Sequence, residues 1–361
     1  MAVRMSLASR VLSGAVVAVL VLAMVSLLRS DDGGGGGNGT VGIDEEDEHD
    51  TLSEPEAGES TTSTGTTNLA ATLTKPSAYF VLAAERTRWF ECFRMAQGLV
   101  EFGSRHRLLC CTLEPASAVS AEETAAANAL NMDFVHWSQF WQPSQRWDGW
   151  DGVRGNWKVS WNKLNAFRMY EYDVLVHLDT DVVMMRQVDE LFATVNDAFP
   201  FAQTYGHDGC DHLPYGLNGG VFVVHPTQAL FDNLMRFIDQ PCEGRSNPHC
   251  SWLFGGSEQT VLALMMGELP NVNKELWGGR SMPLLGYVYN LWGKACKCNN
   301  FEWLQKTGAI YHMIDPKPWH SNANFECAGY LHDMYERHAT NARAFLQANH
   351  PIAAKTLPLS T

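Results

Sequence analysis

Two aspartates directly follow a strongly apolar segment near the middle of the chain. The segment Asp173–Leu178 reads Asp-Val-Leu-Val-His-Leu and leads into Asp179-Thr-Asp181. Residues two apart on an extended strand face the same way, so the two carboxylates should lie close together. Close carboxylates repel each other, and a divalent cation that prefers hard oxygen ligands, such as Mg²⁺ or Mn²⁺, relieves that repulsion. The alternative is a turn with two solvated acids, because Asp-x-Asp alone is common.

Residues suited to binding a charged ligand recur on both sides of this pair. His312 and Lys317 lie in the run His-Met-Ile-Asp-Pro-Lys-Pro-Trp. Each residue of this kind has a plainer alternative: a core histidine, a solvated lysine, or glycines that mark a tight bend. The remaining candidates are Lys163 in Trp-Asn-Lys-Leu, Asn218, Gly219 and Gly220 at the start of Asn-Gly-Gly-Val-Phe-Val, and Glu258 and Gln259 after Gly-Gly-Ser.

Taken in order, these motifs resemble glycosyltransferase family 8, the family of glycogenin. In that family an apolar strand leads into L-D-A-D, several apolar residues and D-E-L-F. Here the same order ends in Asp189-Glu190-Leu191-Phe192. The Lys-Leu segment before the strand, the Asn-x-Gly-Val strand after it, and the closing His to Lys-Pro-Trp element follow in the family's order. The resemblance covers roughly residues 78–320, and five motifs in order are more specific than any one.

The resemblance implies a nucleotide-binding α/β fold of the GT-A type and a retaining, metal-dependent transfer of sugar from a UDP-sugar. The expected acceptor is a glycan, glycoprotein or glycolipid. A metal at the diphosphate would offset the negative charge that develops as the sugar leaves. An imidazole ligand favours Mn²⁺ over Mg²⁺. The implied metal ligands are Asp179, Asp181 and His312; the implied donor contacts are Lys163, Asn218, Gly219, Gly220 and Lys317; the implied catalytic residues are Glu258 and Gln259.

Two departures from the family pattern leave details open. The spacing from His312 to Lys317 is one residue shorter than is usual in the family, which leaves open how Lys317 contacts the donor phosphates. Glu258 stands where the family carries Asp, so either Glu258 or Gln259 is the polar group that faces the donor sugar.

Two other functions remain alternatives. One is a catalytically silent relative that binds a sugar or a partner, against which the intact Asp179, Asp181, His312 and Lys317 argue. The other is a sugar-phosphate nucleotidyltransferase. Two points argue against it: the location in the secretory lumen that the N-terminal segment predicts (below), and the absence of a glycine-rich loop near residues 79–88. The charge distribution gives no reason to expect a nucleic-acid partner, and the sequence does not determine the oligomeric state.

Short apolar runs alternate with helical patterns from Tyr79 onward, which predicts an α/β fold with a mostly parallel, mixed central sheet. The expected strands are Tyr79–Ala84, Arg107–Thr112, Phe134–Trp137, Asp173–Leu178, Phe201–Tyr205, Gly220–Val224 and Ala309–Met313. The expected helices are Thr87–Phe102, Ala121–Leu130 and Trp161–Tyr170.

The N-terminal part has the composition of a membrane-targeting signal. The apolar run Val11–Leu28 is eighteen residues long and follows Arg4 and Arg10. This length is typical of a spanning helix, whereas a cleaved signal peptide is the alternative. The preceding positive charge predicts a type II orientation and, with the resemblance, a Golgi location. The expected organisation is a cytosolic tail (1–10), a signal anchor (11–29), a disordered acidic stem (30–75), a catalytic domain (76–345) and a C-terminal tail (346–361).

The stem and the cysteines fit a luminal setting. Residues 31–74 carry eleven acidic residues and no Lys or Arg, and they include the glycosylation sequon Asn38-Gly-Thr40. Such a segment cannot bury enough apolar surface to become ordered. The nine cysteines of the chain predict disulfides in an oxidising compartment, with a pairing that the sequence leaves open.

Overall fold

The computed structural model describes residues 75–140, 155–205, 217–238, 258–265, 284–292, 306–314, 317 and 329–357. They belong to one compact unit, Leu69–Thr361. The expected anchor at 11–29, almost all of the expected stem at 30–75, and six of the nine cysteines lie outside the described residues. Among the helices that are described, none combines the length and apolar character needed to cross a membrane.

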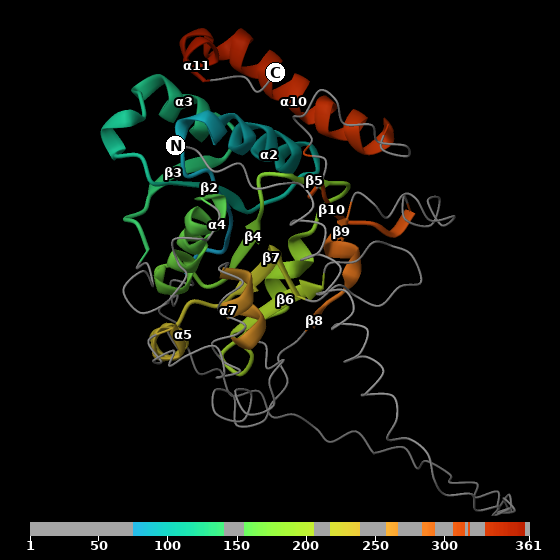
Figure 1. Ribbon diagram of the computed structural model, residues 1–361. Coiled ribbons are helices and arrows are strands. Elements are labelled where there is room, and N and C mark those ends of the chain that lie inside the picture. Colours follow the sequence, from blue (N-terminus) through green and yellow to red (C-terminus); the bar gives the residue numbers. More distant parts are fainter. Residues whose placement is uncertain are drawn as a thin grey trace, which may run out of the picture. The chain divides into compact units, whose positions relative to one another are not determined.

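A seven-stranded mixed sheet forms the centre of this unit (Figure 1). The strand order is β3-β2-β1-β4-β7-β6-β8. All neighbouring pairs are parallel except the two that involve β7, which runs antiparallel to β4 and β6. The expected mostly parallel, mixed sheet is therefore confirmed. The strands are β1 (Ala78–Leu82), β2 (Arg107–Thr112), β3 (Met132–His136), β4 (Leu175–Leu178), β6 (Phe201–Tyr205), β7 (Leu217–Val224) and β8 (Leu284–Leu285).

The strands are continuous apolar runs because both faces of the sheet are covered. On β1, Tyr79 and Val81 enter one hydrophobic cluster, and Ala78 and Phe80 enter the other. Residues of α2 (Trp89–Glu101) and α10 (Gly329–Asn349) pack into the first cluster. Residues of the 3-10 helix η5 (Trp161–Arg168), α5 (Gln228–Ile238) and α7 (Glu258–Met265) pack into the second.

The remaining helices are short. The best-defined start is that of α3 (Ala121–Ala129), where Ser120 and Glu123 form a capping box that satisfies two backbone N–H groups. The others are α4 (Gly155–Ser160), α11 (Pro351–Thr356), and the 3-10 helices η1 (Arg86–Arg88), η2 (Ala116–Ala118), η6 (Asp189–Ala193) and η7 (Tyr287–Tyr289).

A second sheet of three very short strands lies beyond the end of β4. It contains β5 (Val182–Met184), β10 (Ile310–His312) and β9 (Leu291–Trp292) in that order. β10 pairs antiparallel with β5 and parallel with β9. Only β10 was expected from the sequence. The other two have two or three residues, which is too short to show a period.

Two expectations differ from the structure in detail. The helix expected at Trp161–Tyr170 is a 3-10 helix that ends at Arg168 and follows the α-helical turn α4. The boundary expected at residue 345 falls inside α10, which continues to Asn349. Leu346, Ala353 and Leu357 are buried in the first hydrophobic cluster, so the packed region extends to at least residue 357.

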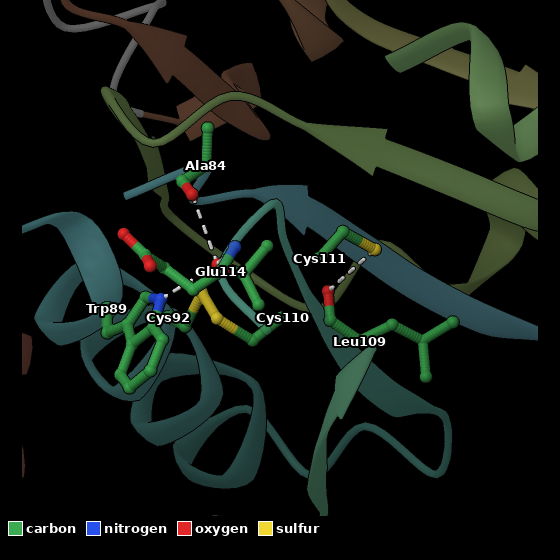
Figure 2. The surroundings of a disulfide bond; sticks show 8 residues. Ala84, Trp89, Cys92, Leu109, Cys110, Cys111 and Glu114 are labelled. Atoms are coloured by element: carbon green, nitrogen blue, oxygen red, sulfur yellow. Dashed lines mark hydrogen bonds between the residues drawn. A yellow bond between two sulfur atoms is a disulfide. The ribbon is translucent and has the colours of Figure 1, made fainter. Parts of the chain in front are cut away.

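A disulfide between Cys92 and Cys110 joins α2 to β2, with the two Cα atoms 5.7 Å apart (Figure 2). Next to it, the indole of Trp89 donates to the hydroxyl of Thr112 at 3.2 Å. The neighbouring thiol, Cys111, is free and buried, and its burial raises its pKa. The expectation of disulfides is thus confirmed for one pair among the three described cysteines.

Candidate metal and donor site

The Asp179–Asp181 turn links the central sheet to the small one. β4 ends at Leu178, and the backbone N–H of Asp179 donates to Gly220 O of β7 at 2.9 Å. The turn closes with a bond from Val182 N to Asp179 O, after which β5 begins. Because Val182 pairs with His312 across the β5–β10 ladder, the histidine lies beside both aspartates.

Three potential ligand atoms converge at this turn. One atom each from Asp179, Asp181 and His312 lie within 4.8 Å of one another. The Nε2 atom of His312 is 3.2 Å from Asp181 Oδ1 and 3.7 Å from Asp179 Oδ2. A small divalent cation about 2.1 Å from each ligand needs ligand atoms roughly 3 to 4.2 Å apart. These three residues therefore fit such a cation, and two carboxylates with one imidazole suit Mn²⁺ or Mg²⁺.

Two asparagines fix the orientation of the His312 ring. Its Nδ1 atom lies 3.1 Å from Asn218 Oδ1 and 3.0 Å from Asn290 Oδ1. Both neighbours are acceptors, so Nδ1 donates to them, and Nε2 is the ring nitrogen that faces the aspartates and would bind a metal. A hydrogen bond of this kind on the far nitrogen is the usual support for a metal-ligating histidine.

The carboxylate oxygens that face away from His312 are held by other donors. Asp179 Oδ1 lies 2.8 Å from the ammonium of Lys163 and 3.0 Å from Nε2 of His177. Asp181 Oδ2 forms an ion pair with the ammonium of Lys317. Each aspartate thus has one oxygen occupied by a cation and leaves the other toward the imidazole.

The neighbouring charges keep Asp179, Asp181 and Lys163 in their charged forms. Burial raises the pKa of Asp179, but Lys163 and His177 outweigh that effect, and the pKa lies well below its ordinary value. Burial also opposes ionisation of Asp181, whose pKa is nevertheless lowered, chiefly by His312. Burial lowers the pKa of Lys163. Asp179 and Glu258 together raise it by more than burial lowers it, so the net shift is upward.

The two glycines near the start of β7, Gly219 and Gly220, allow the close approach of other site residues. A Cβ atom on Gly220 would lie 2.2 Å from Cε1 of His312, which no real contact permits. A Cβ atom on Gly219 would lie 3.1 Å from Oε1 of Glu258, a tight but smaller overlap. The functional interpretation of these glycines therefore has a physical basis: they make room for His312 and Glu258.

Glu258 and Gln259 start α7, close to the glycines. Glu258 is buried and pairs with Lys163 at 2.8 Å, and Ser160 donates a hydrogen bond to its other oxygen. Gln259 accepts through its side-chain oxygen from the backbone N–H of Gly219 at 3.1 Å. Lys163 thereby bridges Glu258 to Asp179 and connects the candidate catalytic residue with the metal turn.

The structure places all ten sequence-predicted site residues in one connected region. They are Lys163, Asp179, Asp181, Asn218, Gly219, Gly220, Glu258, Gln259, His312 and Lys317. Three further members were missed: Ser160, His177 and Asn290. Only His177 had a visible signal, since a polar residue inside an apolar strand and two positions before Asp179 requires a partner. Asn290 belongs to no motif, and only the fold brings it to His312.

Comparison with known proteins gives relatives that match part of the chain. No family model matches the sequence. Inositol phosphorylceramide glucuronosyltransferase 1 of Arabidopsis thaliana is 33% identical over 176 residues, which cover 44% of this chain and 28% of that protein. UDP-glucuronate:xylan alpha-glucuronosyltransferase 2 of the same plant is 21% identical over 175 residues, which cover 47% and 24%. The matches thus span about a quarter of the length of these curated relatives.

The chain is similar in sequence to glycosyltransferases. This agrees with the resemblance to glycosyltransferase family 8. Solved structures with a similar arrangement include galactosyltransferase LgtC with donor and acceptor sugar analogs, at TM-score 0.46 and 13% identity over 73% of this chain and 95% of that one. Another is the bifunctional glycosyltransferase WbbM, at TM-score 0.49 and 12% identity over 80% and 52%.

Proposed function

We propose that this chain is a metal-dependent glycosyltransferase that transfers a sugar from a UDP-sugar, with retention of configuration, to a carbohydrate-bearing acceptor. The observation that carries the proposal is the convergence of Asp179, Asp181 and His312 on one point. The glucuronosyltransferases to which the chain is similar support the reaction class. Both are named for transfer of glucuronic acid, which makes UDP-glucuronate the first donor to test.

The charges of the site suit a donor diphosphate. Three carboxylates, those of Asp179, Asp181 and Glu258, surround two ammonium groups, those of Lys163 and Lys317. These five groups sum to one negative charge, so a divalent cation makes the site positive by one. A Mn²⁺ ion held by Asp179, Asp181 and His312 would neutralise charge on the leaving diphosphate.

Each side chain has a distinct part in this mechanism. Lys317, whose side chain is about one third exposed, can move from Asp181 to a phosphate oxygen. Lys163 is almost buried and holds Asp179 and Glu258 in place. Glu258 pairs with Lys163 and lies against Gly219, where its carboxylate can stabilise positive charge on the sugar as the bond from sugar to phosphate breaks.

The test is donor turnover with and without metal. UDP release from UDP-glucuronate, UDP-glucose, UDP-galactose and UDP-xylose is measured across a manganese titration, beside Asp181→Asn and His312→Ala. We expect one donor to be hydrolysed in a Mn²⁺-dependent way, and each variant to lose at least about a hundredfold, equivalent to about 2.7 kcal/mol in the barrier. Thermal melting reports whether each variant remains folded.

The alternatives give different results in the same assay. A catalytically silent relative that binds a sugar or a partner releases no UDP from any donor. A nucleotidyltransferase forms a nucleotide-sugar from UTP and a sugar phosphate and releases pyrophosphate. Parental turnover and manganese dependence in Asp181→Asn would show that Asp181 is not a metal ligand.

We also propose that the chain acts in the Golgi lumen as a type II membrane protein with Val11–Leu28 as its anchor. The apolar run and the Cys92–Cys110 disulfide support this location, because disulfides persist in oxidising compartments. If the anchor is real, carbonate washing leaves the full chain in the membrane, and a version that starts at residue 31 behind a cleavable secretion signal appears in the medium. Retention of that version in washed membranes would contradict the anchor.

A further inference from the structure

Glu91 and Arg94 of α2 and Tyr335 of α10 form a buried cluster, and Arg94 joins this cluster to the metal turn. Arg94 of α2 is 1% exposed, and its Nη2 atom donates to Thr180 O at 2.9 Å and to Val182 O at 3.2 Å. These carbonyls belong to the residues on either side of Asp181. The carbonyl of Asp181 itself accepts from Met313 N at 2.9 Å. Three consecutive carbonyls of the turn are therefore held, two of them by one guanidinium.

Arg94 is itself held by both helices. Its Nε atom donates to Glu91 Oε2, one turn earlier on α2, at 2.7 Å. The hydroxyl of Tyr335 on α10 donates to the other oxygen of Glu91 at 2.8 Å, and the guanidinium lies 4.5 Å from the centre of the Tyr335 ring. Glu91 and Tyr335 are 1% and 2% exposed, so the cluster excludes water.

The arrangement suits positioning better than charge stabilisation. A lone buried cation beside the turn would repel a divalent metal at Asp181, but Glu91 offsets that charge at 2.7 Å. What remains is a planar fork of donors that fixes the peptide groups around the metal ligand. Lysine cannot reproduce it, because an ammonium on a flexible stem lacks the fixed fork of donors that can hold Glu91 and both carbonyls together.

We propose that the Glu91–Arg94–Tyr335 cluster is a positioning device for Asp181, through which the docking of the C-terminal helix α10 sets the affinity of the metal site. The proposal rests on the metal dependence proposed above. Arg94 acts through the turn and touches neither metal nor donor. Partners behind metal ligands typically change metal affinity by about 10–100-fold when they are lost.

The experiment measures binding of Mn²⁺ alone to the purified full chain, by the paramagnetic resonance signal of the free ion, together with the melting temperature. Arg94→Lys keeps the charge next to Glu91 and loses the fork, so we expect its dissociation constant for Mn²⁺ to rise about tenfold. Arg343→Lys is the matched control, since Arg343 lies in the same α2–α10 interface, over the Phe90 ring and beside Glu336. It should bind Mn²⁺ within about twofold of the parent.

A second pair of variants separates the contribution of α10 to Mn²⁺ affinity from that of Arg94. Tyr335→Phe removes only the hydroxyl that binds Glu91, and we expect a smaller loss of Mn²⁺ affinity in the same direction. Asn341→Ala is its control, because Asn341 joins α10 to α2 through Glu101 at 2.6 Å, about 1.7 turns further along the helix.

Each outcome separates this inference from the proposed function. A parent chain without Mn²⁺ binding that depends on Asp181 overturns both. Parental Mn²⁺ affinity in Arg94→Lys overturns the positioning role alone. Equal losses of affinity in Arg94→Lys and Arg343→Lys, each following its loss of melting temperature, would also overturn it, since they indicate only a general effect of stability.

Discussion

Gly220 lies where the main chain of β7 passes closest to the His312 ring. A side chain at this position would enter the imidazole, with Cβ 2.2 Å from Cε1 and 2.3 Å from Nδ1. Through Nδ1, the same ring edge donates hydrogen bonds to the side-chain oxygens of Asn218 and Asn290. The orientation of a candidate metal ligand on β10 therefore depends on the absence of one methyl group on β7.

We predict that Gly220→Ala weakens Mn²⁺ binding by at least tenfold, because His312 must turn away from both aspartates. Overfilling a packed region also costs about 1–3 kcal/mol in the free energy of unfolding. Mn²⁺ titration and urea unfolding measure the two effects. Repeating Gly220→Ala in a His312→Ala background should reduce the stability cost, because the overlapping ring is gone.

Gly286→Ala is the control, since its Cβ would find only contacts of 3.8 Å or more. It should leave both Mn²⁺ affinity and stability near the parental values. An equal stability cost of Gly220→Ala in the presence and absence of the His312 ring would contradict the steric explanation.

The site could be predicted at this scale where chemistry and sequence motif coincide. The spacing of Asp179 and Asp181 after an apolar strand indicates their role, and the nearby Lys-Pro-Trp motif indicates that of His312. Arg94 was missed because a helical pattern reveals apolar positions and treats a charged residue as solvated. Its partners, Thr180 O and Tyr335, are 86 and 241 positions away, and no local pattern indicates such distances.

At the scale of elements, the α2–α10 contact contains a buried histidine next to the Arg94 cluster. His338 of α10 is 1% exposed, and its Nδ1 atom lies 3.2 Å from Glu101 Oε2. Burial first, then the charges of Arg94 and Arg337, lower its pKa, and Glu101 opposes them. The folded protein therefore disfavours the protonated imidazole at this interface.

We predict that acidification destabilises this contact. The unfolded chain has an ordinary histidine pKa of about 6.5, so it binds the proton that the folded state resists. The free energy of unfolding should therefore fall as the pH drops through about 6.5 toward the lower folded pKa of His338. Urea unfolding at pH 7.5, 6.5 and 5.5 measures the change, and His338→Gln should lose less stability over this range than the parent.

His136→Gln controls for the removal of an imidazole as such, because His136 is exposed at the end of β3. A parental loss of stability on acidification that is unchanged in His338→Gln would assign the effect to other groups.

The elements that were predicted well are those with a clear apolar signal. β2 and β6 have the expected bounds, and α2 begins two residues late, after a 3-10 turn. Val100, assigned to the apolar face of α2, is 47% exposed, because the last turn of that helix extends past the packed interface. Glu91 and Arg94 take buried positions on the same helix. An apolar count thus locates a helix but does not tell which of its residues face inward.

At the scale of the described unit, the position of the site follows from the parallel sheet. β1, β2, β3 and β4 are parallel, so their carboxyl ends share one edge, which is where ligands bind in open α/β sheets. Asp179 directly follows β4. Among the described strands of this sheet, β7 is the one reversed strand, and it carries Asn218 and the two glycines near its start, at the same edge. The reversal of β7 is what brings its first residues, rather than its last, to the metal turn.

The C-terminal elements complete the packing of the first hydrophobic cluster. α11 and the end of α10 bury Leu346, Ala353 and Leu357 in the first hydrophobic cluster. Thr356 also donates to Glu123 at 3.0 Å, the residue that caps α3. Burying one leucine side chain stabilises by about 1.5–3 kcal/mol. We predict that deleting residues 346–361 lowers the free energy of unfolding by about 3–6 kcal/mol, a large part of the 5–15 kcal/mol typical of a domain.

Deleting only residues 358–361 is the matched control and should leave stability unchanged, because Leu357 remains. Urea denaturation of the parent and both deletions tests the prediction. If the longer deletion unfolds like the parent, the packed unit ends near residue 345, and the burial of Leu346 and Leu357 contributes nothing to stability. A loss confined to the longer deletion instead makes the C-terminus an integral layer of the same fold that carries Arg94 and the metal turn.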